Sequence, residues 1–231
     1  MKISIVFGIM ALTAASLVAA ESSPKDDVSS AAKALGEKAN YSWTATVAVP
    51  ADSRYHPGPT DGKTEKDGAT QVTMKFGDNT TEIVLQGGKS AVHTEDGGWQ
   101  SPSELDDQGP GRFLGAMIHN FKAPAAQAAE LAGDVKELKK DGDVYSGDLT
   151  EEGAKALLQF RRGGNATVSD AKGSAKFWIK DGVLSKFESK VSGKVSFNGN
   201  DRDVDRTTTT EIKDVGATKV EVPDDAKKKL S

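Results

Sequence analysis

Apolar and polar residues alternate over most of the chain, and this period of two predicts β-strands. Residues 41–49 alternate in this way, and between residues 72 and 99 short apolar runs are separated by turn signals such as Gly87-Gly88. Because strands follow one another without space for crossover helices, the pattern excludes a parallel sheet and predicts antiparallel hairpins. The Pro- and Gly-rich residues 50–62 are predicted to form a loop.

The same alternation predicts a long hairpin in the last third of the chain. Residues 177–180 and 183–197 flank the turn Asp181-Gly182, and the apolar residues of the second arm fall mainly on odd positions. Further strands are predicted at residues 135–139, 144–149 and 207–212 and through Val220 and Val222. From the parity of their strands, four residues are expected on the covered face of the sheet: Trp43, Trp178, Phe187 and Val191.

Helical patterns interrupt the strands at several places. Ser23-Pro24 followed by two aspartates is typical of a capped helix start, and Thr150 followed by two glutamates is another. Helices are predicted over residues 23–39, 110–121, 124–131, 150–163 and 223–230. These patterns together predict an α+β domain, in which a single twisted antiparallel β-sheet has its helices on one side.

The first twenty residues have the parts of a secretory signal peptide. Lys2 is followed by an apolar run to Val18, and Val18-Ala19-Ala20 before Glu21 is a small-residue cleavage site. An uncleaved membrane anchor is the alternative, because the run approaches the length that a bilayer requires. We expect cleavage after Ala20, so that residues 21–231 form one exported domain that is not an integral membrane protein.

Composition narrows the possible chemistry. The 231 residues include 30 Lys and Arg against 34 Asp and Glu, which gives a net charge of −4, and there is no cysteine. The acidic balance argues against a nucleic-acid partner. The absence of cysteine excludes disulfides, thiol nucleophiles and thiolate metal sites, and for an exported chain it favours the periplasm of a Gram-negative bacterium.

Candidate catalytic and metal-binding residues are few. His56, His93 and His119 are far apart and lack a second ligand at metal-binding spacing. The series Asp201, Asp203, Asp205 fails as a calcium loop, because the sixth place requires glycine and holds arginine. Neither a nucleophile elbow nor a phosphate-binding loop occurs. The sequence therefore predicts no enzyme, no metal and no cofactor.

One apolar stripe on the helix predicted over residues 110–121 suggests a binding function. Its members recur at helical spacing, and they are Phe113, Leu114, Met117, Ile118 and Phe121. The stripe can be ordinary core, or it can line a cleft, because Met and Phe are adaptable walls for an acyl chain. The predicted ligand-binding set adds three strand residues, Trp43, Met74 and Phe76.

Two segments near the C-terminus resemble a known family. Residues 177–188, Phe-Trp-Ile-Lys-Asp-Gly-Val-Leu-Ser-Lys-Phe-Glu, are similar to a hairpin of the LolA-like superfamily of periplasmic lipoprotein carriers and lipid-binding lipoproteins, and Val222-Pro223-Asp224 resembles its usual ending. The resemblance implies a strongly curved half-barrel sheet whose concave side, covered by helices, takes up a lipid or the acyl chains of a lipoprotein. The alternative is a periplasmic interaction or envelope-sensing module that keeps this fold and contacts another envelope protein without binding lipid.

Overall fold

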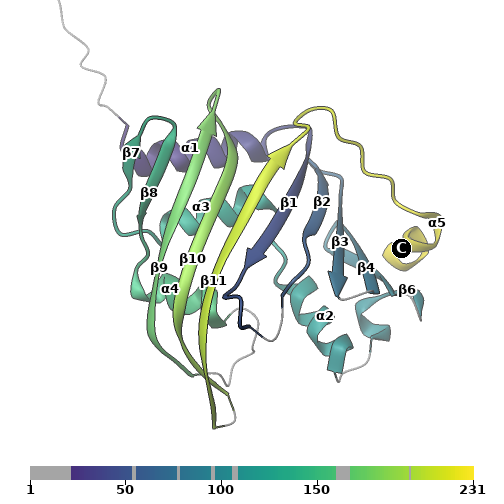
Figure 1. The fold of residues 1–231 in the computed structure, drawn as a ribbon. Helices are drawn as coiled ribbons and strands as arrows, with labels where there is room; N and C mark the ends of the chain where they lie inside the picture. Colours follow the sequence, from purple (N-terminus) through teal and green to yellow (C-terminus); the bar gives the residue numbers. More distant parts are fainter. Residues whose placement is uncertain are drawn as a thin grey trace, which may run out of the picture.

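A single antiparallel sheet organises the molecule (Figure 1). The computed structural model describes residues 22–53, 56–76, 79–94, 97–105, 109–159, 167–197 and 199–231, and within them lie eleven strands and five α-helices. The predictions for residues 1–21, including the signal peptide, fall outside this described part.

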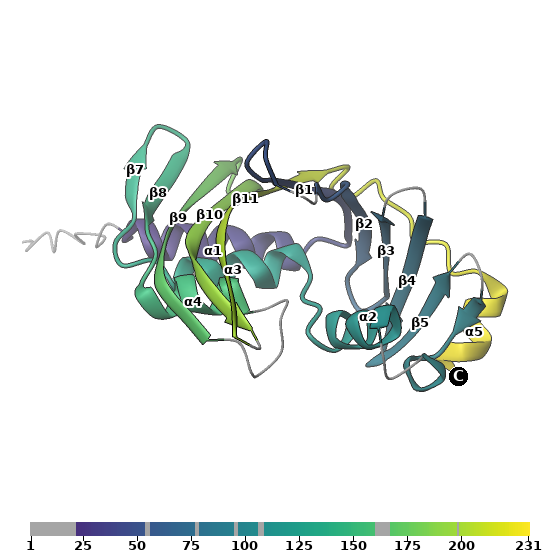
Figure 2. The ribbon, with the colours of Figure 1, turned by 60° about the horizontal axis from the view of Figure 1, so that its bottom comes forward.

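The strand order places the first strand in the middle of the sheet. The order is β6-β5-β4-β3-β2-β1-β11-β10-β9-β8-β7. The strands are β1 (Asn40–Ala48), β2 (Thr60–Glu65), β3 (Ala69–Phe76), β4 (Asn79–Gln86), β5 (Lys89–Thr94), β6 (Gly98–Gln100), β7 (Lys139–Asp141), β8 (Val144–Asp148), β9 (Thr167–Lys180), β10 (Val183–Phe197) and β11 (Asn200–Lys213). The sheet arches over its helices as a half-barrel (Figure 2), so the predicted fold class is confirmed.

Three helices cover the concave side of one half of the sheet: α1 (Pro24–Gly36), α3 (Pro124–Gly133) and α4 (Glu151–Gln159). The predicted caps explain where two of them begin. Ser23 and Asp26 form a capping box at α1, and the Thr150 hydroxyl accepts a hydrogen bond of 3.0 Å from the Gly153 backbone N–H at α4. Their apolar faces meet the sheet in one continuous core, which includes Leu35, Leu158 and the fully buried Phe177.

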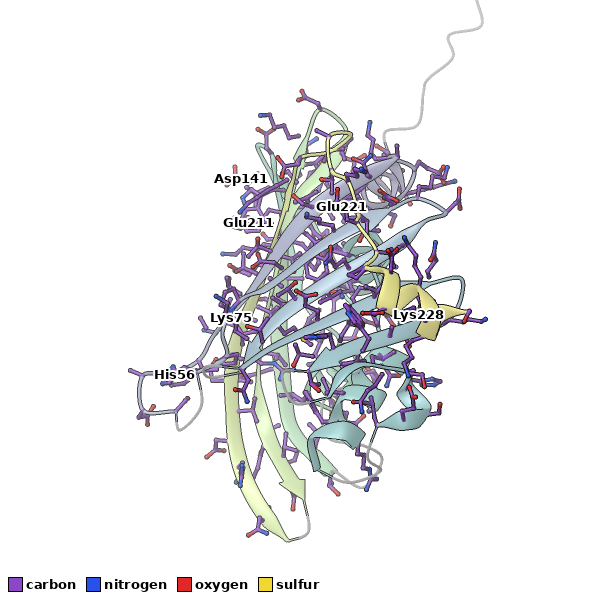
Figure 3. The ribbon with its side chains drawn as sticks, turned by 90° about the vertical axis from the view of Figure 1, so that its right-hand side faces the viewer. His56, Lys75, Asp141, Glu211, Glu221 and Lys228 are labelled. Atoms are coloured by element: carbon purple, nitrogen blue, oxygen red, sulfur yellow. The ribbon has the colours of Figure 1, made fainter. Side chains whose placement is uncertain are left out.

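The other two helices occupy the second half of the molecule. The helix α2 (Gly109–His119) lies on the concave side, below β2–β5 (Figure 2). The helix α5 (Asp224–Leu230) covers the opposite face, so the prediction that the helices lie on one side of the sheet is wrong for this helix. This end of the sheet has two apolar faces, because Val84 and Ala91 alternate with Ile83 and Val92. A second, smaller cluster therefore lies under α5, with Val220 and Ala226 in it. The convex face elsewhere is charged, as at Lys75 and Glu211 (Figure 3).

Several predicted strand boundaries are wrong. Residues 60–62 belong to β2 rather than to the predicted loop. The strand predicted over residues 135–139 is reduced to an isolated bridge between Val135 and Leu149, and β7 begins only at Lys139. The strand predicted through Val220 and Val222 is absent, and both residues lie in irregular chain. The Val220 backbone N–H donates a hydrogen bond of 2.9 Å to the Glu65 side chain instead of to the backbone of a neighbouring strand.

Trp178 lies on the convex face, which contradicts its predicted place on the covered side. It stands opposite Lys186 and Val144 in the sheet, and the Lys186 ammonium lies 4.7 Å from the centre of its ring. The neighbouring Phe177 is the residue that enters the core. Trp43, Phe187 and Val191 are buried there as predicted.

Candidate functional site

The apolar stripe on α2 is split between two faces of the helix. Leu114 is buried, and Met117, Ile118 and Phe121 are half-buried against the main core. Phe113 stays 38% exposed and lies on the outward side. The helix thus turns its apolar side to the sheet but leaves much of that side incompletely covered.

Trp43 is the central side chain opposite this helix. Its indole lies flat across β2 at Gly62, where a β-carbon would stand only 2.2 Å from two ring carbons. The indole N–H donates to the Thr64 hydroxyl over 3.3 Å, and the ring of Phe121 stacks on Trp43 with centroids 6.4 Å apart. Gly62 is therefore what allows Trp43 to bridge β1, β2 and the segment after α2.

Six of the eight predicted site residues meet in the main apolar cluster. They are Trp43, Met74, Leu114, Met117, Ile118 and Phe121. Met74 lies on β3, two residues after Val72, which is in the same row across the sheet as Trp43 and Gly62. Phe113 lies apart from them on the outer surface of α2, and the side chain of Phe76 lies outside the described part of the structure.

The wall that β1–β5 present to α2 carries no charged side chain at any described position. The sheet register places residues of one face opposite one another, as in the row Trp43, Gly62, Val72, Ile83 and Val92. The neighbouring rows add Ala45, Thr60, Met74 and Thr81 on one side and Tyr41, Thr64, Thr70, Leu85 and Ser90 on the other. Charges such as Asp61 and Lys63 fall on the opposite face, so the wall suits an uncharged apolar group.

Threonine and glycine positions in this wall are parts of the candidate site that sequence reasoning missed. Thr81 and Ser90 are buried, although their side chains are polar. Burial also raises the pKa of the Tyr41 phenol, so this group stays neutral at physiological pH. The alternation Thr60, Gly62, Thr64 was the available signal, although it lacks the large apolar residues that usually reveal a strand.

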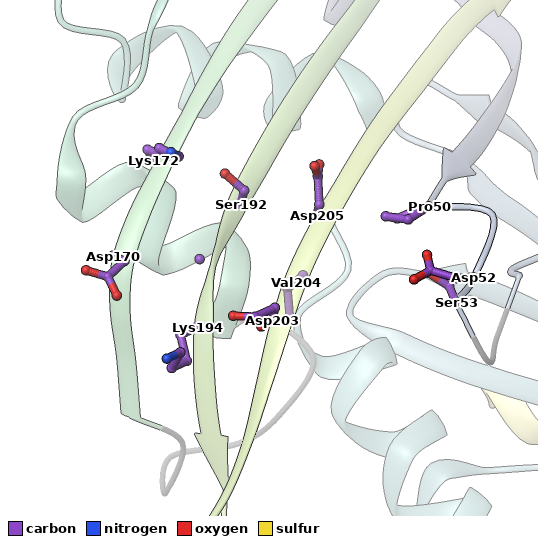
Figure 4. Close-up of a pocket in the computed structure, with 11 residues that line it drawn as sticks. Pro50, Asp52, Ser53, Asp170, Lys172, Ser192, Lys194, Asp203, Val204 and Asp205 are labelled. Carbon is purple, nitrogen blue, oxygen red and sulfur yellow. The ribbon is translucent and has the colours of Figure 1, made fainter.

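Two surface pockets lie away from the predicted site. One, of about 550 Å³, is lined by the loop at residues 50–53 and by charged residues of β9–β11, including Asp170, Lys172 and Lys194 (Figure 4). The other, of about 480 Å³, lies between β2, β3 and residues 221–224. The charged lining of both pockets does not suit an acyl chain.

The histidines stand on separate elements. His56 lies in the loop after β1 (Figure 3), His93 lies on β5 against the ring of Trp99, and His119 ends α2. Within the described ranges no group of three His, Asp or Glu side chains stands close enough to hold a metal ion. No helix in those ranges is long and apolar enough to cross a membrane.

A single curved antiparallel sheet with helices inside its curve is the architecture that the resemblance implied. The crystal structure of the lipoprotein LppX from Mycobacterium tuberculosis is similar, with a TM-score of 0.51, 13% sequence identity, and coverage of 87% of this chain and 98% of LppX. LprF from Mycobacterium bovis gives a TM-score of 0.44 at 14% identity, over 88% and 97% of the two chains. The chain matches no protein-family model and no curated protein sequence. The fold assignment rests on LppX.

Proposed function

We propose that this chain is a non-enzymatic carrier or binding protein for a lipid or for the acyl chains of a lipoprotein. The ligand enters between α2 and the uncharged wall of β1–β5, where it contacts Trp43, Met74, Leu114, Met117, Ile118 and Phe121. The LolA-like fold supports this proposal, because the family resemblance implies acyl uptake on the concave side of the sheet.

The incomplete burial of the α2 stripe carries the proposal. The core-facing residues of α1, such as Val28 and Leu35, are fully buried, whereas Met117, Ile118 and Phe121 on and after α2 are only half-buried. An acyl chain placed beside them gains about 0.8 kcal/mol for each methylene removed from water, so ten buried methylenes contribute about 8 kcal/mol before the cost of ordering. The site thus offers apolar surface that a ligand can cover.

Export to the periplasm is part of this proposal. The signal at residues 1–20 and the absence of cysteine are the sequence observations that support it. We expect the mature protein to begin at Glu21. Sequencing the N-terminus of the exported protein tests this, and a product that keeps Met1 and stays in the membrane fraction contradicts it.

Binding of a fluorescent fatty acyl probe, measured beside thermal melts, tests the function. Met117→Trp adds bulk on the α2 side of the proposed cleft, and Phe121→Ala removes the ring that stacks on Trp43, so both are expected to change probe affinity more than stability. Leu158→Ala, in the packed core under α4, is the matched control and is expected to lower stability with little effect on affinity. If the wild type shows no saturable binding and both α2-side variants only lose stability, the stripe is core and the interaction-module alternative replaces the carrier.

A further inference from the structure

Two rows of hydroxyl groups flank the apolar middle row of the wall that β1–β5 present to α2. Because residues two apart on a strand share a face, the rows on either side of Ile83 and Val92 also face the concave side. The hydroxyl-bearing residues of these rows are Thr60 and Thr81 on one side and Tyr41, Thr64, Thr70 and Ser90 on the other. The wall is thus uncharged but not wholly apolar.

The hydroxyls of Thr81 and Ser90 are buried without a hydrogen-bond partner in the described part of the chain. Thr81 is 7% exposed and Ser90 is 8% exposed, and neither side chain takes part in a hydrogen bond there. In the same wall, by contrast, the Thr64 hydroxyl accepts from the Trp43 indole N–H. Buried polar groups are normally hydrogen-bonded, because a buried hydroxyl without a partner costs free energy. A ligand that bonds to these two hydroxyls would remove this cost.

The oxygen atoms of these two hydroxyls are within reach of a ligand. Every completely enclosed side-chain nitrogen or oxygen atom in the described part of the chain has a hydrogen-bond partner. The oxygens of Thr81 and Ser90 have none there, so they are not completely enclosed. A polar group placed against the wall can therefore donate to them or accept from them.

The described residues around the wall offer no charge to pair with an ionised ligand. The side chains that α2 packs against the main core are apolar, and its basic neighbours Arg112 and Lys122 are exposed. On β11, Arg206 shares the covered face with Val191, but its guanidinium donates to the Leu157 carbonyl of α4. Burying an ionised group without an opposite charge is costly, so the site disfavours a carboxylate or a phosphate.

We propose that the hydroxyls of Thr81 and Ser90 select acyl esters of uncharged alcohols, such as acylglycerols, over ionised fatty acids and phospholipids. This inference rests on the proposed function and names the class of its ligand. The acyl chain lies along the apolar middle row, and the ester carbonyl or the alcohol hydroxyl bonds to a hydroxyl beside it. Neighbouring rows of one face are about 7 Å apart, so a chain on the middle row has hydroxyls close by on both sides.

Displacement of the fluorescent fatty acyl probe by ligands of one chain length tests this selection. The competitors are palmitoylglycerol, palmitoylglycerol phosphate and palmitate, each used below the concentration at which it forms micelles. At about pH 8, palmitoylglycerol is expected to displace the probe at a concentration about tenfold lower than either ionised competitor, because it buries no charge. Lowering the pH to about 5 protonates a larger share of the palmitate carboxyl and should narrow its difference from palmitoylglycerol.

Variants that remove the two hydroxyls test whether these groups cause the selection. The double variant Thr81→Val/Ser90→Ala is expected to bind palmitoylglycerol several-fold more weakly and palmitate unchanged, and the single variants divide the effect between the two positions. Thermal melts should show no loss of stability, because no hydrogen bond within the described part is removed. Thr73→Val, on the opposite face of β3, is the matched control and is expected to change neither affinity.

The outcomes separate this inference from the proposed function. A wild type without saturable probe binding refutes the proposed function and the inference with it. Saturable probe binding with equal displacement by palmitoylglycerol and palmitate keeps the carrier and overturns the selection. The selection is also overturned if the double variant keeps the preference, if Thr73→Val weakens palmitoylglycerol binding equally, or if the double variant loses stability, because the hydroxyls then have partners inside the protein.

Discussion

Replacing Gly62 with alanine should displace Trp43 and destabilise the protein. The added β-carbon would lie 2.2 Å from the indole carbons, whereas carbon atoms in contact stay about 3.5 to 4.0 Å apart. The indole must move away by roughly 1 Å or more, and Phe121 is stacked on it. Overpacking of a core costs about 1 to 3 kcal/mol and the loss of an aromatic contact about 0.5 to 1.5 kcal/mol, so we expect a loss of about 2 to 4 kcal/mol in the free energy of unfolding.

Urea denaturation followed by tryptophan fluorescence measures this loss. Gly133→Ala is the matched control, because no atom lies within 4 Å of the new β-carbon and its backbone conformation is ordinary. This control is expected to leave stability unchanged or to raise it by up to about 1 kcal/mol. Gly62→Ala is also measured in a Trp43→Leu variant, which lacks the indole ring that the alanine methyl group would meet.

The double variant decides whether the contact between Gly62 and Trp43 is the cause. In the Trp43→Leu background we expect Gly62→Ala to cost less than about 1 kcal/mol, so that the two substitutions are strongly coupled. Equal costs in both backgrounds would refute the reasoning. The same substitution should also alter acyl-probe affinity, because Trp43 forms part of the proposed cleft.

Two further predictions concern the core and the C-terminal segment. Phe187→Ala should lower the free energy of unfolding by about 3 to 5 kcal/mol, and a denaturation midpoint near that of the wild type would show that Phe187 lies outside the core. The Lys229 ammonium, helped by hydrogen bonds from Ser101, lowers the pKa of Glu104 from 4.5 to about 2. Because the folded-state pKa is the lower one, this stabilisation is complete above about pH 4.5 and is lost as the pH falls towards 2. Glu104→Gln should therefore flatten the fall in stability over that range, and parallel pH profiles of the two proteins would contradict this.

The sequence predicts those elements whose large apolar residues alternate clearly. The strands at residues 41–49 and 183–197 and the capped starts of α1 and α4 were predicted because their signals are local. The first half of β9 was missed, because its half-buried positions Ala171 and Gly173 hold small residues. At Gly173 a β-carbon would lie 2.4 Å from the Lys190 carbonyl oxygen and 2.9 Å from Leu149, so close packing there requires a residue that gives no hydrophobic signal.

The candidate site was predicted only in its large side chains. Helical spacing identified Leu114, Met117 and Phe121, but it could not tell which side of α2 faces the sheet, and so Phe113 was included. The role of Gly62 depends on a contact between two strands, and the position of Trp178 depends on which of two adjacent aromatic residues enters the core. Tertiary packing decides both features, and the pattern of apolar residues in one sequence carries no information on tertiary packing.

The central position of β1 has a consequence for the biogenesis of the protein. β1 pairs on one side with β11, and the side chains of Ser42 and Asp214, which are hydrogen-bonded at this seam, are 172 residues apart in sequence. The sheet cannot close until nearly the whole chain has been synthesised, and contacts this distant in sequence form slowly. A chain that emerges N-terminus first therefore cannot form this central seam until β11, close to its C-terminal end, has been made.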